Sequence, residues 1–158
     1  MMTTATLSAQ DGKATTVKKT FSRATSVSIL IDSDVSIIWA LLTNASDFPR
    51  WNSTVLSIDG EIKVGEKIKL KSYLDPDRTF KIKIKEIIKD QKMVWGDAMG
   101  TRVFTLTKTE KGVLFSMDEK IASPMFPLFA GQIPSFDESF EKYAADLKKE
   151  AELIAKGK

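Results

Sequence analysis

The 158-residue sequence contains neither cysteine nor histidine. Without cysteine the chain has no disulfide, no thiolate nucleophile and no thiolate metal ligand. Without histidine it also lacks Ser-His and Cys-His catalysis, imidazole zinc sites and the usual proton shuttle at neutral pH. Any acid–base chemistry must use carboxylates, lysine, tyrosine or bound water. We therefore predict no metal site and no cofactor.

The chain also lacks a strong excess of charge and any long apolar run. Lys and Arg number 24 against 21 Asp and Glu, and this net charge of +3 is weak evidence for a polyanionic partner. No apolar run is long enough to cross a bilayer. The N-terminal residues lack the apolar core of a secretory signal. We expect a cytoplasmic protein with no nucleic-acid partner and no membrane span; the sequence specifies no oligomeric state.

The length of the chain suits one domain, which can bury a core without metal or disulfide staples. Residues 1–20 are rich in Thr, Ser, Ala and Lys and have little apolar content. We interpret them as a mobile polar arm, with a lipid- or partner-binding tail as the alternative. Because no repeat or linker follows residue 20, residues 21–158 are predicted to form a single domain.

The spacing of apolar residues predicts the order of the elements. Alternation over residues 24–32 predicts a first strand. Helical spacing predicts a short helix over residues 34–43, and a second short turn carries Phe48 and Trp51. From residue 54 the period is two and the turns are short, which predicts an antiparallel meander of six strands.

The meander has one apolar face and one lysine-rich face, which is typical of an antiparallel sheet covered on one side only. We interpret the lysines as a solvated convex face. The apolar loop 121–134 is either a lid or ordinary packing. From Phe136 to Ile154 apolar residues recur every three or four positions, which predicts a helix of about six turns. The simplest arrangement lays this helix across the concave side of the sheet.

Several segments in this order carry a family resemblance: SILIDSDVSIIWALLTNASDFPRWNSTV, VGEKIKL, MVWGDAMGTRVFTL, FSMDEK and FDESFEKYAADLKKEAE. Over about residues 23–155 the chain resembles the START-like (SRPBCC) superfamily, most of all its polyketide cyclase/dehydrase-like subgroup. The resemblance implies an α+β helix-grip fold. In this fold a curved antiparallel sheet of about seven strands wraps around a long C-terminal helix, and two short helices follow the first strand. It also implies a cavity between sheet and helix that holds a small hydrophobic or amphipathic molecule.

The turn lengths predict which charged residues lie opposite each other. The turn at 109–112 places Arg102 opposite Glu119, and the turn at 99–100 places Asp97 opposite Arg102. Two carboxylates then flank one guanidinium, with Cβ atoms about 4.5–5.5 Å apart. A charge that faces a cavity is costly unless it is paired. This row is either the polar end of an apolar pocket or a solvated rim of the sheet.

Aromatic and methionine side chains on the same face are candidates for the pocket lining, with an ordinary packed core as the alternative. A row beside Arg102 is predicted to align Glu86, Trp95, Phe104 and Met117. A buried Tyr143 needs a hydrogen-bond partner for its phenol. The candidate ligand-binding residues are Trp95, Asp97, Arg102, Phe104, Phe115, Met117, Glu119, Phe136, Phe140 and Tyr143.

Three functions fit these observations. The first is binding of a small hydrophobic or amphipathic ligand. The second, implied by the resemblance, is a cyclase/dehydratase-type enzyme acting on a polyketide-like substrate. In that enzyme Arg102 would stabilise an oxyanion, and Asp97, Glu119 or Tyr143 would donate or accept a proton. The third is a protein-interaction module with a collapsed cavity. The absence of His and Cys favours binding over catalysis.

Overall fold

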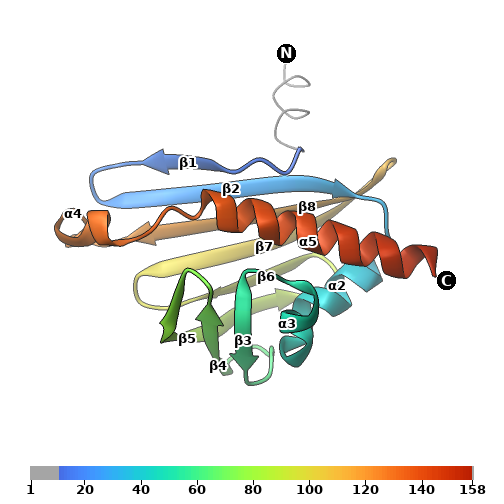
Figure 1. Cartoon of the computed structure of the whole chain (residues 1–158), viewed down its shortest axis with the longest axis horizontal. Helices are drawn as coiled ribbons and strands as arrows, with labels where there is room; N and C mark the ends of the chain where they lie inside the picture. Colours follow the sequence, from blue (N-terminus) through green and yellow to red (C-terminus); the bar gives the residue numbers. More distant parts are fainter. Residues whose placement is uncertain (1–10, 158) are drawn as a thin grey trace, which may run out of the picture.

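The computed structural model describes residues 11–157, which form one curved antiparallel sheet with the long helix α5 lying across one face (Figure 1). The strands are β1 (Thr15–Lys18), β2 (Ser22–Ile31), β3 (Val55–Asp59), β4 (Lys67–Ser72), β5 (Asp75–Ile88), β6 (Lys92–Gly96), β7 (Gly100–Thr109) and β8 (Gly112–Ala122). The helices are α2 (Val35–Thr43), α3 (Phe48–Trp51), α4 (Phe126–Phe129) and α5 (Asp137–Lys156), and the 3₁₀ turns are η1 (Ala45–Asp47) and η2 (Ala130–Gln132).

The strand order is β1-β2-β8-β7-β6-β5-β4-β3, so the six strands from β3 to β8 form the predicted meander. β2 closes this meander by pairing with β8 over its whole length, from Ser22 opposite Ala122 to Ile31 opposite Val113. α2 and α3 connect β2 to the far edge strand β3 (Figure 1). The α+β helix-grip architecture is thus confirmed, with eight strands instead of about seven.

α5 buries the predicted apolar stripe against the sheet. Phe140, Tyr143, Leu147 and Ala151 are at most 1% exposed. Full burial of a large apolar side chain contributes about 1.5–3 kcal/mol. This one helix therefore supplies a large share of the core's stabilisation, and it fixes which sheet residues it covers.

The additional strand lies in the segment that the sequence assigned to a mobile arm. β1 pairs with β2, from Thr15 opposite Ser26 to Lys18 opposite Arg23. The Ala14 N–H also donates to Glu141 Oε2 of α5 at 2.8 Å. The arm prediction is therefore wrong for residues 15–18, and residues 1–10 lie outside the described residues. The four-residue strand TTVK has one apolar side chain and is held by backbone pairing, so it gave no periodic signal.

The register of the last two strands is confirmed, but that of β6 is not. Arg102 lies opposite Glu119. Across β6 and β7, however, Trp95 lies opposite Arg102, two residues from the predicted pairing with Asp97. β6 ends at Gly96, where an added Cβ would lie 2.3 Å from the Gly100 carbonyl oxygen. This close backbone approach lengthens the turn and places Asp97 in it.

A bulge in β5 also corrects the predicted row beside Arg102. Ile84 lies opposite Trp95, and beyond the irregularity Glu86 lies opposite Val94. Independently of this bulge, the register of β6 and β7 pairs Met93, and not Trp95, with Phe104. A single extra residue in one strand reverses which side chains face the core, and the alternating sequence gave no sign of it.

The segment 121–134 is more regular than the predicted loop. It contains the single-turn helix α4 and the 3₁₀ turn η2. Phe126 is buried, whereas Leu128 and Met125 are 72% and 56% exposed. The segment therefore packs on the rest of the protein through the ring of Phe126, whereas Leu128 and Met125 remain exposed to solvent.

The opposite face of β4 and β5 is exposed, as the sequence predicted for the lysine stripe. Lys67 lies opposite Lys83, and Lys69 lies opposite Lys81. Like charges directly opposite each other destabilise a sheet by roughly 0.2–1 kcal/mol per pair. This part of the sheet therefore keeps two repulsive pairs.

We predict that Lys83→Glu stabilises the fold by about 0.5 kcal/mol, because it turns a repulsive cross-strand pair into an attractive one. Urea unfolding at about 0.01 M and about 1 M salt measures the effect, which should shrink as the Debye length falls. Lys83→Gln is the matched control and should give a smaller gain. An effect that is equal at both salt concentrations would contradict an electrostatic origin.

Candidate functional site

A cavity of about 230 Å³ lies between the sheet and the N-terminal part of α5. Its walls come from the concave sides of β4, β5 and β6, from the β6–β7 turn, from β7 and β8, and from residues 132–136 with the first turns of α5. Six of the ten candidate residues line it: Trp95, Asp97, Arg102, Glu119, Phe136 and Tyr143.

The other four candidate residues belong to the packed core. Phe104, Phe115, Met117 and Phe140 are at most 1% exposed and do not line the cavity. They lie close to the cavity residues on the same face of the sheet or on α5, but other side chains cover them. For these four residues the alternative of an ordinary core, which the sequence left open, agrees with the structure.

Arg102 and Glu119 form the polar contact at the inner wall. Arg102 Nε donates to Glu119 Oε1 at 2.5 Å, and the two side chains are only 19% and 17% exposed. The Arg102 guanidinium also lies over the ring of Phe140, 4.9 Å from its centroid. The predicted row of three charges is therefore a pair, which lines the cavity wall.

Asp97 has a different role from the one predicted. It is exposed, and its Oδ1 accepts hydrogen bonds from the backbone N–H groups of Met99 and Gly100 at 2.9 and 2.8 Å. These bonds hold the β6–β7 turn at the outer edge of the cavity. The carboxylate thus organises a turn and does not flank Arg102.

Arg23 supports a wall of the cavity without lining it, and the sequence analysis missed this role. It is 7% exposed, and it donates to the carbonyl oxygens of Ile133 and Pro134 at 3.2 and 2.8 Å. Its guanidinium lies 4.6 Å from the ring centroid of Phe136. Burial lowers the pKa of Arg23, and the negative charges of Glu119 and Asp137 oppose that shift.

Arg23 and Arg102 are linked by two stacked rings. Phe136 and Phe140 are nearly parallel, at 4° with centroids 6.0 Å apart. Arg23 contacts the first ring and Arg102 the second. Cation–π contacts of this kind contribute about 0.5–2 kcal/mol. This column fixes residues 132–136, which form one wall of the cavity.

Tyr143 lies where the cavity meets the core. Its ring centroid is 6.1–6.3 Å from those of Phe48, Trp51, Phe104 and Phe115. Its hydroxyl is buried and has no hydrogen-bond partner among the described residues. Burial raises the pKa of Tyr143, and the nearby Arg102 charge opposes this only in part. The phenol therefore stays protonated at neutral pH and can act as a donor.

The outer part of the cavity comes from the β4–β5 hairpin, which the sequence analysis did not include. Leu74 and Asp75 line the cavity here, together with Phe80 and Arg78. The Arg78 guanidinium lies 4.6 Å from the centroid of the Phe80 ring. The sequence analysis predicted one apolar face for the meander, but nothing in the sequence set this hairpin apart from the core.

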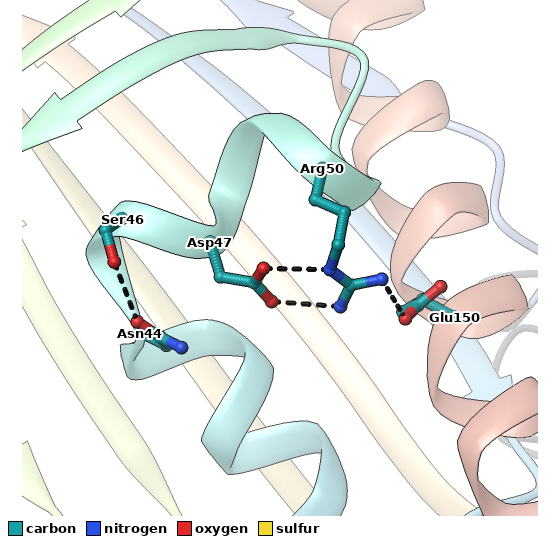
Figure 2. A network of polar contacts seen from close by, with 5 residues as sticks. All are labelled: Asn44, Ser46, Asp47, Arg50 and Glu150. Carbon is teal, nitrogen blue, oxygen red and sulfur yellow. Dashed lines mark hydrogen bonds and ion pairs between the residues drawn. The ribbon is translucent and has the colours of Figure 1, made fainter.

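A polar network joins α5 to the short helices at the other end of the molecule (Figure 2). Arg50 donates from Nε and Nη2 to the two carboxylate oxygens of Asp47, at 2.8 and 2.9 Å, and from Nη1 to Glu150 of α5 at 2.6 Å. The Arg50 hydrogen bond lowers the pKa of Asp47. This exposed network connects α3, which carries Trp51, to α5.

Two kinds of feature are absent from residues 11–157. No group of three or more Asp or Glu side chains lies together in a way that could hold a metal ion. No helix of these residues combines the length and the apolar character that crossing a bilayer requires.

Comparison with known proteins identifies the family. The family model described as Activator of Hsp90 ATPase homolog 1-like protein matches residues 32–152. The chain belongs to this family. Among curated proteins no sequence matches the chain significantly.

Several solved structures share the fold of this chain. A START superfamily protein from Mycobacterium smegmatis is 14% identical with a TM-score of 0.60, over 83% of this chain and 98% of that one. A protein from Rhodobacter sphaeroides is 14% identical with a TM-score of 0.64, over 87% and 97%. A putative protein in the dynemicin biosynthetic locus is 12% identical with a TM-score of 0.64, over 82% and 47%. The START-like resemblance is thus confirmed, and at these identities the solved structures show the fold alone.

We predict that Arg102 and Glu119 stabilise the fold jointly. Arg102→Met and Glu119→Gln should each destabilise it by about 1–3 kcal/mol, because each leaves a partly buried partner without its charged hydrogen bond. A double-mutant cycle by chemical denaturation should give a coupling energy of about 1 kcal/mol or more. A coupling near zero would mean that solvent screens the pair, as at an open rim.

We predict that Arg23 holds the wall at residues 132–136. Arg23→Met should speed amide hydrogen exchange there and destabilise the fold by about 2 kcal/mol, since two carbonyls lose a charged donor. Arg23→Lys is the matched control: it keeps the charge but lacks the planar fork, so its effect should be intermediate. Unchanged exchange in Arg23→Met would overturn the assignment.

Proposed function

We propose that this protein binds a small hydrophobic or amphipathic molecule in the cavity between the sheet and α5. The observation that carries the proposal is a largely apolar cavity lined by Tyr143, whose buried hydroxyl has no hydrogen-bond partner within residues 11–157. A buried hydroxyl normally has a partner, and an unmatched one suggests that a partner arrives with a ligand. We place this binding in the cytoplasm, a compartment that the absence of cysteine fits.

The size of the cavity limits the ligand. A cavity of about 150 Å³ holds benzene, and drug-sized ligands occupy about 300–1,000 Å³. At about 230 Å³ this cavity suits a substituted ring and is too small for a long acyl chain without rearrangement. The walls combine an aromatic side, from Trp95 and Phe136, with a polar side, from Arg102 and Glu119. Such a division orients an amphipathic molecule.

The alternative of a cyclase or dehydratase acting on a polyketide-like substrate needs a carboxylate that can accept a proton. Glu119 is engaged by Arg102. Asp97 accepts two backbone hydrogen bonds in its own turn. Both candidate bases are thus occupied by structural contacts, which supports binding over catalysis.

The alternative of a protein-interaction module draws on the name of the family and on the lysine face of β4 and β5. That alternative expects a collapsed cavity, because no ligand would need the space. An open space of about 230 Å³ weighs against it. The two alternatives therefore rank below ligand binding.

We expect the natively folded protein from its own cells to carry a non-covalent small molecule that native mass spectrometry detects and that denaturation removes. We also expect one of a panel of flavonoids, polyketide-like aromatics and fatty acids to raise the melting temperature. At a ligand concentration of about 100 times Kd the gain is about 2.7 kcal/mol, or roughly 5–10 °C.

Substitutions at Ser139 of α5 control this experiment, because Ser139 lines the cavity and makes no side-chain hydrogen bond among the described residues. Ser139→Phe should fill the cavity and remove both the bound mass and the thermal shift. Ser139→Ala keeps the space and should retain them. No adduct and no shift with any compound would reject the proposal and favour the interaction module.

A further inference from the structure

The charges around the inner end of the cavity cancel. Arg102 pairs with Glu119, and Arg23 lies within the electrostatic reach of Glu119 and Asp137. Two cations and two carboxylates therefore lie in this region, and Arg102 and Glu119 are in direct contact. Burying an anion requires a compensating positive charge, and here every positive charge already has a negative one.

The outer lining adds no positive excess. Arg78 lines that part of the cavity, and so do two carboxylates, those of Asp75 and Asp97. A carboxylate or phosphate ligand would therefore enter a cavity whose lining is neutral or slightly negative. The free energy of desolvating such an anion would not be offset. This disfavours anionic ligands, fatty acids included, and favours uncharged ones.

The polar groups that remain available are donors. The Tyr143 hydroxyl has no partner among the described residues, and burial keeps it protonated. Arg102 uses its Nε for Glu119, and its two Nη groups make no hydrogen bond within residues 11–157. Arg102 and Tyr143 both line the cavity, and the Tyr143 hydroxyl is buried at its edge without a partner among residues 11–157. A ligand oxygen that reaches both residues would satisfy these donors, and a carbonyl oxygen can accept two hydrogen bonds.

We propose that the natural ligand is a compact, uncharged carbonyl compound whose oxygen accepts hydrogen bonds from Tyr143 and Arg102. The whole molecule is a substituted ring with about ten non-hydrogen atoms in total. This inference rests on the proposed function and narrows it. The ring lies between Trp95 and Phe136, and the oxygen faces the polar wall. Tyr143 is then a specificity-determining residue, because a hydrocarbon of the same shape leaves its hydroxyl unpartnered.

The test compares three probes of similar size: acetophenone, ethylbenzene and benzoate. Dissociation constants come from the chemical-shift changes of the protein at neutral pH. The measured quantity is the ratio of the dissociation constant of ethylbenzene to that of acetophenone. An effect of the substitution that weakens the binding of both compounds equally cancels in this ratio. Benzoate should bind at least about ten-fold more weakly than acetophenone, since its charge has no free counter-charge.

The variant is Tyr143→Phe, and the chain's other tyrosine supplies the matched control. Tyr73 is 58% exposed and does not line the cavity. Tyr143→Phe should lower the ratio about 3- to 10-fold, the value of one buried hydrogen bond, whereas Tyr73→Phe should leave it unchanged. Without ligand, Tyr143→Phe should unfold at the same denaturant concentration as the unmodified protein or at a higher one, because it removes an unpartnered polar group.

The outcomes separate this inference from the proposed function. If acetophenone and ethylbenzene bind but the ratio does not change in Tyr143→Phe, the carbonyl inference is wrong and the binding function stands. The inference is also wrong if benzoate binds more tightly than acetophenone, or if only compounds outside the three probes bind. If neither the probes nor the wider panel binds, the proposed function fails as well.

Discussion

The apolar contact between α5 and the concave face of the sheet is the interaction on which the rest of the structure depends. Leu147 and Ala151 lie in the C-terminal half of the helix and are fully buried in the core. Toward the N-terminus of α5 the packing opens, and Phe140 and Tyr143 meet a wall that carries charges. One helix therefore closes a dry core at one end and bounds a cavity at the other. The packed core and the cavity are thus divided along its length.

The elements were predictable where one physical signal dominated. The stripe of α5 and the alternation of β7 and β8 placed Tyr143, Arg102 and Glu119 on one face, and their turn had a length that left a single register. The predicted pairing of Asp97 with Arg102 was wrong, because the position of Asp97 depends on a close backbone approach at Gly96 that no side-chain pattern encodes. The strand β1 and the bulge in β5 were not predicted for a similar reason, since both are set by backbone hydrogen bonds.

Arg23 shows a different limit of sequence reasoning. It begins an ordinary strand, and its partners are carbonyl oxygens about 110 residues later in the chain. A guanidinium that binds backbone carbonyls needs no matching side chain, so the partner sequence carries no complementary charge or motif. The resemblance to the START-like fold implied the cavity in general terms, whereas the identity of the residues that fix its wall required the three-dimensional arrangement.

The position of α5 after the last strand of the sheet has a consequence for biosynthesis. The sheet is complete at residue 122, and its longest-range pairing joins β2 to β8 across about ninety residues. The helix that covers the sheet occupies residues 137–156 and therefore leaves the ribosome after the strands. During translation the concave apolar surface is therefore made before its cover exists, and exposed sheet surfaces of this kind associate readily. The repulsive lysines on the convex side keep the nascent sheet from stacking on that face while its other face waits for the final helix.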